Sequence, residues 1–241
     1  MKKLIFNGYQ AENLGFIVVE GCGEIISQEE YELVSVEGRN GNLLINKNTY
    51  GDIEKEFTIT SLNFEDDDDI DEMINNIKTW LFNITDNKLY YAFENKYNLV
   101  KKVTTEDIKT AFEEFGDFKI KFLCEPFYYI NEEKITINKT GNTEVTYTFT
   151  NNGDFESEPI IKIYGNGALG FYLNGINVAV RNVTSSVEID TKLFQCTSNK
   201  VNKIQDFLTE FPTLKMGENT IIIPAEQNIT KIEVTPRTVY R

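Results

Sequence analysis

Residues 171–178 have the sequence Phe171-Tyr172-Leu173-Asn174-Gly175-Ile176-Asn177-Val178 and predict a β-hairpin. Apolar residues recur at every second position on both sides of the central pair, which is the period of a strand with one buried face. Asn174 and Gly175 both tolerate the positive φ angles of a two-residue turn. The stretch therefore indicates antiparallel β-structure in the second half of the chain.

Strand-like stretches continue on both sides of this hairpin, throughout residues 131–241. They are Ile135/Ile137, Val145/Tyr147/Phe149, Ile161/Ile163, Val187/Ile189, residues 221–223 and Ile232/Val234. Many short strands separated by turns are typical of a β-sandwich. Residues 199–208 are apolar at four positions and are compatible with a short helix or a turn. We expect residues 131–241 to form an antiparallel β-sandwich domain.

Residues 1–130 predict a mixture of strands and helix. Phe118-Lys119-Ile120-Lys121-Phe122 alternates strictly, and Cys124 falls on its apolar face. Residues 31–36 and 43–45 flank Gly38-Arg39-Asn40-Gly41, which predicts a hairpin with a tight turn at Asn40-Gly41. Residues 57–60 alternate too, but beyond Ser61 the apolar Leu62 and Phe64 change face, which indicates a bulge or a strand end.

One helix is indicated by a single apolar stripe at helical spacing. Its members are Ile70, Met73, Ile74, Ile77, Trp80 and Leu81. The acidic run, residues 65–72, places negative charge where it offsets the positive end of the helix dipole. A shorter helix is expected within residues 106–115. The predicted fold is mainly β, with an α+β domain over residues 1–130 that has one clear helix.

The charge balance argues against nucleic-acid binding through phosphate contacts. The 241 residues carry 24 Lys and Arg against 38 Asp and Glu, a formal net charge of -14. Residues 1–130 hold 13 of the basic and 25 of the acidic residues, a net of -12. Proteins that grip phosphates need clustered Lys and Arg instead.

The residue inventory excludes several kinds of catalytic and metal site. The chain has no His, which removes Ser-His-Asp and Cys-His nucleophiles and His-containing zinc sites. Cys22, Cys124 and Cys196 form no Cys-x-x-Cys pair, so they suit a reducing compartment such as a bacterial cytoplasm. We assign no catalytic, cofactor-binding or metal-ligating residue, and expect no cofactor.

Several weaker candidates have a simpler interpretation. The acidic run lacks the EF-hand spacing for Ca²⁺, so a solvated helix start is favoured. A pair of carboxylates for glycoside hydrolysis carries no specificity among so many acidic residues. Gly21-Cys22-Gly23 and Gly165-Asn166-Gly167 match no phosphate-binding loop and are interpreted as turns. No stretch is apolar enough to predict a membrane helix.

The order of these features resembles the distal tail protein family of long-tailed, siphovirus-type bacteriophages of Gram-positive bacteria. In the first domain the similar stretches are residues 36–43 (Val36-Glu37-Gly38-Arg39-Asn40-Gly41-Asn42-Leu43), Tyr50-Gly51-Asp52, residues 77–81, 89–93 and 116–129. In the second they are residues 153–165, Ile189-Asp190 and residues 211–219. Glu37 departs from the Pro that the family often has, which affects only the local turn.

The resemblance implies a structural virion protein at the tail tip, not an enzyme. Its first domain, 1–130, would form a tail-tube-like hexameric ring, and its second, 131–241, would be a galectin-like β-sandwich. The ring would join the tail tube to the tail-associated hub protein and anchor receptor-binding or baseplate proteins. It implies no sequence-specific nucleic acid binding and no membrane partner, although DNA would pass through the ring lumen. The charge balance adds a hypothesis: part of the acidic excess faces the lumen and repels the phosphates of DNA. The acidic run, residues 65–72, could equally lie on the outside of the ring as a solvated helix start.

A carbohydrate-binding or cell-wall-acting two-domain protein remains the alternative. Galectin-type recognition stacks a sugar on Trp and uses His, and residues 131–241 contain neither. Tyrosines would have to replace them. Self-association into a ring discriminates between the two functions.

Overall fold

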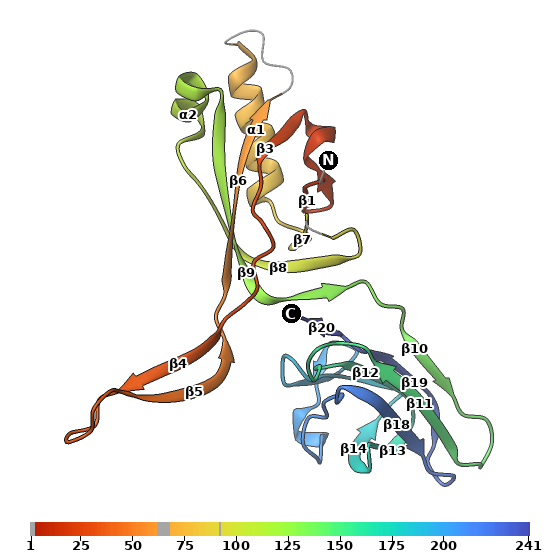
Figure 1. Ribbon diagram of the computed structural model, residues 1–241. Coiled ribbons are helices and arrows are strands. Elements are labelled where there is room, and N and C mark those ends of the chain that lie inside the picture. The colour runs from red at the N-terminus through yellow and green to blue at the C-terminus, as the bar shows by residue number, and fades with distance from the viewer. Residues whose placement is uncertain (1–2, 62–67, 92) are drawn as a thin grey trace. The chain divides into compact units, whose positions relative to one another are not determined.

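The computed structural model describes residues 3–61, 68–91 and 93–241. The described chain is mainly β and separates into two compact units, Met1–Tyr129 with Arg241, and Ile130–Tyr240 (Figure 1). Each unit has its own hydrophobic core. Among the described residues, no helix combines the length and apolar character needed to cross a membrane.

The first unit is built on one antiparallel sheet. Its strands lie in the order β2 (Tyr9–Gln10), β1 (Ile5–Phe6), β7 (Lys88–Tyr90), β8 (Lys96–Thr105), β9 (Asp117–Ile130), β6 (Ile53–Ser61) and β3 (Phe16–Glu20). A short 3₁₀ helix, η1 (Ala11–Leu14), joins β2 to β3. The predicted alternation in β9 is confirmed, because Phe118, Ile120, Phe122 and Cys124 are fully buried. Lys121 lies outside, 3.1 Å from carboxylate oxygens of Glu54 and Glu56 on β6.

Helix α1 (Asp68–Phe82) packs its apolar stripe into this core. Ile77, Trp80 and Leu81 are buried, and the Trp80 ring stacks on Phe16 with centroids 6.0 Å apart. Asn7 explains where the helix ends, because its amide nitrogen donates to the carbonyls of Trp80 and Asn83, each at 3.0 Å. The second predicted helix is confirmed as α2 (Ile108–Phe115).

Three sequence predictions fall outside the described part of the chain. They concern Leu62 and Phe64 after β6, most of the acidic run, and the side chain of Ile70. Of the run, only the Glu72 side chain is described, and it is exposed.

The second unit is a β-sandwich. One sheet has the order β10 (Ile135–Asn138), β19 (Ile229–Thr235), β12 (Ile160–Gly165), β15 (Ser186–Asp190), β16 (Gln195–Ser198) and β17 (Val201–Asn202). The other has the order β11 (Val145–Asn151), β18 (Gly217–Ile223), β13 (Gly167–Leu173) and β14 (Ile176–Val183). Both sheets contribute to one core, and a last short strand, β20 (Val239–Tyr240), ends the unit.

The hairpin predicted at residues 171–178 is confirmed as β13 and β14. Leu173 pairs with Ile176, so the loop consists of Asn174 and Gly175 alone, with φ angles of 53° and 84°. Phe171, Leu173 and Val178 are buried, whereas Tyr172, Ile176 and Asn177 are exposed. Residues 199–208 hold only the 3₁₀ turn η2 (Ile204–Asp206) and strand β17, so no α-helix forms there.

Candidate functional site: an exposed hairpin arm

The most exposed element of the first unit is a two-stranded hairpin. Strand β4 (Glu29–Val34) pairs only with β5 (Leu43–Tyr50) in the described structure, and Figure 1 shows the pair extending away from α1 and α2 as an arm. We call β4, β5 and the loop between them the arm. The predicted hairpin is confirmed, but the tight turn at Asn40-Gly41 is wrong, because residues 35–42 all lie outside the strands. Positive φ angles occur at Gly38 and Gly41, not at Asn40.

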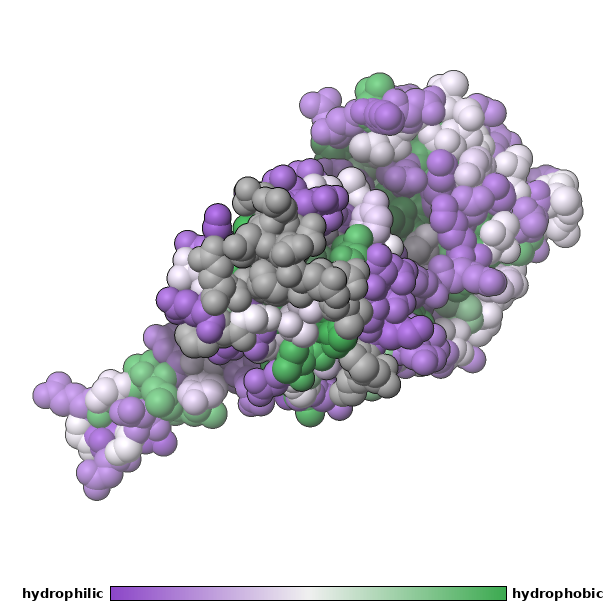
Figure 2. All heavy atoms as spheres, turned by 90° about the horizontal axis from the view of Figure 1, so that it is seen from above, coloured by the Kyte–Doolittle hydropathy of each residue, from purple (hydrophilic) through white to green (hydrophobic). Residues whose placement is uncertain are grey.

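Apolar side chains cover both faces of the arm. Leu33 pairs with Leu44 on one face, where their side chains are 56% and 60% exposed. Tyr31 lies two residues from Leu33 on the same face, and Leu43 and Ile45 lie on the other. Figure 2 shows hydrophobic atoms on the arm that projects at the lower left. A lone two-stranded hairpin is marginally stable in water, so these apolar faces are suited to packing against another surface.

Polar contacts fix the base of the arm. The Asn46 amide and the Tyr50 hydroxyl donate to the two carboxylate oxygens of Glu29, at 2.8 Å and 3.0 Å. The hydrogen bond from Asn46, followed by that from Tyr50, lowers the pKa of Glu29. Tyr50 also packs edge-on against Phe127, with ring centroids 5.1 Å apart. The base is thereby anchored to β9 while the apolar part of the arm stays exposed.

Cys124, Cys196 and Trp80 occupy core positions, whereas Cys22 is half-buried and packs against the core of the first unit. Burial raises the pKa of Cys124 to about 12 and that of Cys196 to about 11, so neither is a thiolate near neutral pH. Trp80 donates from Nε1 to the carbonyl of Phe6 at 3.0 Å and is not presented to a ligand. In the part of the chain that the structure describes, no three Cys, Asp or Glu side chains gather as metal ligands.

Sequence reasoning assigned no site residue and missed the exposed apolar faces of the arm. The available signal was the pairing of two apolar stretches, residues 31–34 and 43–45, around a polar loop. Which of these side chains stay exposed depends on what covers the hairpin, and the local pattern does not contain that information.

The architecture defines a class of protein fold. In this class, a mainly β chain has an α+β unit with a projecting hairpin, followed by a β-sandwich. A solved structure of this class is the SPP1 Dit (gp 19.1) protein, described as a paradigm of the hub adsorption apparatus in Gram-positive infecting phages. The alignment covers 97% of each chain with a TM-score of 0.67 and 16% sequence identity. No protein-family model and no curated protein matches the sequence. The resemblance to distal tail proteins is confirmed as a shared fold.

Proposed function

We propose that this protein is a structural component of a bacteriophage tail tip, assembled as a hexameric ring. The ring joins the tail tube to the tail-associated hub protein and anchors receptor-binding or baseplate proteins. The proposal is supported by the fold shared with SPP1 Dit along nearly the whole chain. Its location is the virion tail tip, reached by assembly in the bacterial host cytoplasm.

The exposed apolar face of the arm is the main structural support for this proposal. Burying a Leu side chain that is more than half exposed contributes about 1 kcal/mol or more. One face of the arm has three large side chains that are more than half exposed: Tyr31, Leu33 and Leu44. A neighbouring copy in a closed ring would cover them in every subunit, which is the repeated contact that a cyclic assembly needs.

The two parts of the chain take different roles in this proposal. Residues 1–130 form the ring, and residues 131–241 form a galectin-like domain that projects from it. DNA passes through the lumen without sequence-specific binding. The net charge of -12 in residues 1–130 supports a lumen that repels phosphates. No enzyme activity and no cofactor is proposed.

Light scattering of arm variants tests the ring. We expect the wild-type chain to associate toward six times its 27.7 kDa mass as concentration rises. The double variant Leu33→Ser, Leu44→Ser should stay monomeric with an unchanged circular dichroism spectrum. Ile176→Ser is the matched control, because Ile176 is 62% exposed on the sandwich, and it should associate as the wild type does. Equal association of the arm variant and the wild type would contradict the proposal.

A further inference from the structure

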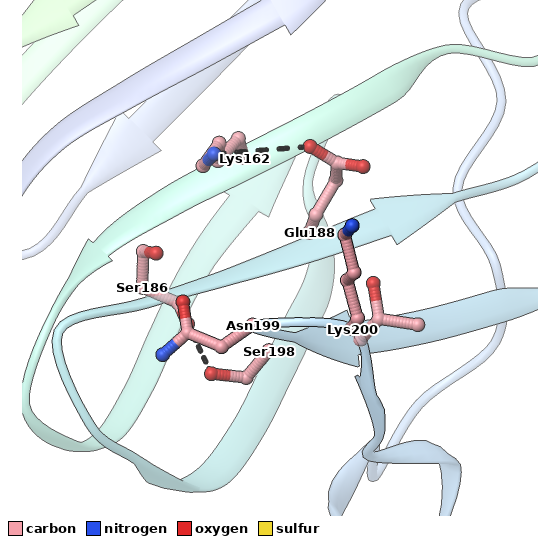
Figure 3. A pocket seen from close by; sticks show the side chains of 7 residues that line it. Lys162, Ser186, Glu188, Ser198, Asn199 and Lys200 are labelled. Carbon is pink, nitrogen blue, oxygen red and sulfur yellow. Dashed lines mark hydrogen bonds and ion pairs between the residues drawn. The ribbon is translucent and has the colours of Figure 1, made fainter.

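A polar pocket lies on the outer face of the six-stranded sheet of the sandwich. Its volume is about 220 Å³, and it is lined by Lys162, Ser186, Glu188, Thr197, Ser198, Asn199 and Lys200. Strands β12, β15 and β16 place these residues side by side, since Lys162 pairs with Glu188 and Glu188 with Thr197. Figure 3 shows the side chains of the turn between β16 and β17 beside those of β12 and β15.

Several groups in this pocket can form further hydrogen bonds. The Ser198 hydroxyl donates to the carbonyl of Ser186 at 2.7 Å, and Lys162 lies 4.0 Å from Glu188, a loose ion pair. Within the described structure, the side chains of Asn199 and Lys200 make no hydrogen bond or ion pair. Two ammonium groups against one carboxylate give the pocket a local charge of +1 in a chain of net charge -14.

The turn that carries Lys200 is strained. Ser198 pairs with Val201, so Asn199 and Lys200 form a two-residue loop with φ angles of 48° and 66°. Glycine is favoured at the second position of such a turn, as in the Asn174-Gly175 loop of the same sandwich. A lysine there adopts a left-handed conformation that L side chains disfavour. Strained residues of this kind concentrate at functional sites, and here the left-handed residue is one that lines the pocket.

We propose that this pocket binds one unit of an anionic saccharide or polyol. Lys200 and Lys162 recognise the acidic group, and the Ser186 and Thr197 hydroxyls and the Asn199 amide hydrogen-bond the hydroxyl groups. The volume is below the roughly 300–1,000 Å³ of pockets for drug-sized ligands, so a single sugar-sized unit is the appropriate occupant. This binding activity is additional to the proposed ring and does not depend on it.

Ligand-observed saturation-transfer NMR with the full-length protein tests the proposal, because it works for a monomer and for a ring. The probe is glucose 6-phosphate, compared directly with glucose at equal ionic strength. Inorganic phosphate has no observable proton, so its affinity is measured by how well it displaces glucose 6-phosphate. We expect saturable binding of glucose 6-phosphate at millimolar concentration, at least about fivefold tighter than either comparison compound, because both halves contribute hydrogen bonds. Absence of saturable binding would overturn the proposal, as would equal binding of inorganic phosphate alone.

Variants locate the binding at the pocket. Lys200→Gln should weaken binding at least about fivefold by removing a charge-assisted hydrogen bond. Lys215→Gln, at an exposed lysine of the same unit outside the pocket, should leave it unchanged. Glu188→Gln should strengthen it, because a carboxylate that repels the anion is removed. Equal affinities of Lys200→Gln and wild type would exclude this pocket.

Replacing the strained lysine by glycine separates binding from folding. Lys200→Gly removes the ammonium and also relieves the left-handed strain, so binding should fall while the midpoint of thermal unfolding stays the same or rises. A fall in that midpoint would show that Lys200 serves the fold, and would overturn the assignment of the turn to ligand binding.

Discussion

The ammonium of Lys55 lies 3.0 Å from the hydroxyl of Tyr128, and both side chains are buried in the first unit. Lys55 occupies an inward position of β6, two residues from the buried Ile53 and Phe57. The same ammonium stands 4.6 Å from the centre of the Tyr128 ring. A buried charge is costly unless hydrogen bonds satisfy it, so this contact stabilises the core where β6 and β9 pair.

Removing the Tyr128 hydroxyl should destabilise the first unit. Tyr128→Phe leaves the Lys55 ammonium with one hydrogen bond fewer, and we expect a loss of about 1.5–3 kcal/mol in the free energy of unfolding, measured by urea titration. Met has a similar volume and no charge, so Lys55→Met should lower the free energy of unfolding by less than Tyr128→Phe does, or raise it. A Tyr128→Phe variant as stable as the wild type would contradict this role.

Gly165, at the end of β12, has no room for a side chain. A Cβ atom there would overlap the backbone carbonyl of Asn228, which cannot move aside as a flexible side chain can. Gly165→Ala should therefore cost about 1–3 kcal/mol in unfolding free energy. Gly170→Ala is the control, because the nearest atom to its Cβ would be 3.7 Å away, and it should change stability by less than about 1 kcal/mol. Similar losses for both variants would refute the steric explanation.

Thiol labelling should distinguish the three cysteines. Cys124 and Cys196 are buried and their pKa values are raised to about 12 and about 11, whereas Cys22 is only half-buried. With an aromatic disulfide reagent at pH 8, the native protein should react at Cys22, and the two others should react only after unfolding. Rapid labelling of Cys124 in the native state would be inconsistent with the core described above.

Protonation of Asp190 at acidic pH should lower the stability of the sandwich. Its carboxylate accepts two hydrogen bonds from Arg237, at 2.7 Å and 2.8 Å. Burial is the largest single effect and raises the pKa of Asp190. The hydrogen bonds from Arg237, those from the backbone of Leu193 and Lys192, and the charge of Arg237 together outweigh it, so the pKa is lowered. A lowered pKa in the folded state means that this stabilisation is present above the ordinary Asp pKa of about 3.9 and is lost as pH falls below it.

Thermal unfolding measured across that pH range tests the Asp190 prediction. Asp190→Asn removes the titrating group, so the variant should be less stable near neutral pH and should lose less stability on acidification. Parallel pH profiles for the variant and the wild type would contradict it.

The sequence predicted the elements whose side-chain pattern is local. The Asn174-Gly175 turn, the alternation of residues 118–124 and the stripe through Ile77 and Trp80 each appear in the structure as expected. In these elements the turn chemistry and the period of the apolar residues point to the same conformation.

Long-range pairing could not be predicted in the same way. The pocket brings Lys162 together with Ser186, Glu188 and residues 197–200, which become neighbours only when β12, β15 and β16 pair. Lys55 sits between Glu54 and Glu56, so its burial is visible only from the strand period that runs through Ile53 and Phe57. The Asn40-Gly41 turn failed because the loop of the arm is longer than two residues and Asn40 does not adopt a positive φ.

The proposed function requires that copies of this chain form a closed ring at the end of a phage tail. Electron microscopy of intact tails carrying a tagged form of this chain tests it most directly. We expect six tags around the distal end of the tail tube, with the arm of each copy packed against its neighbour. Tails whose tip contains no copy of this chain, or copies whose arms extend into solvent, would contradict it.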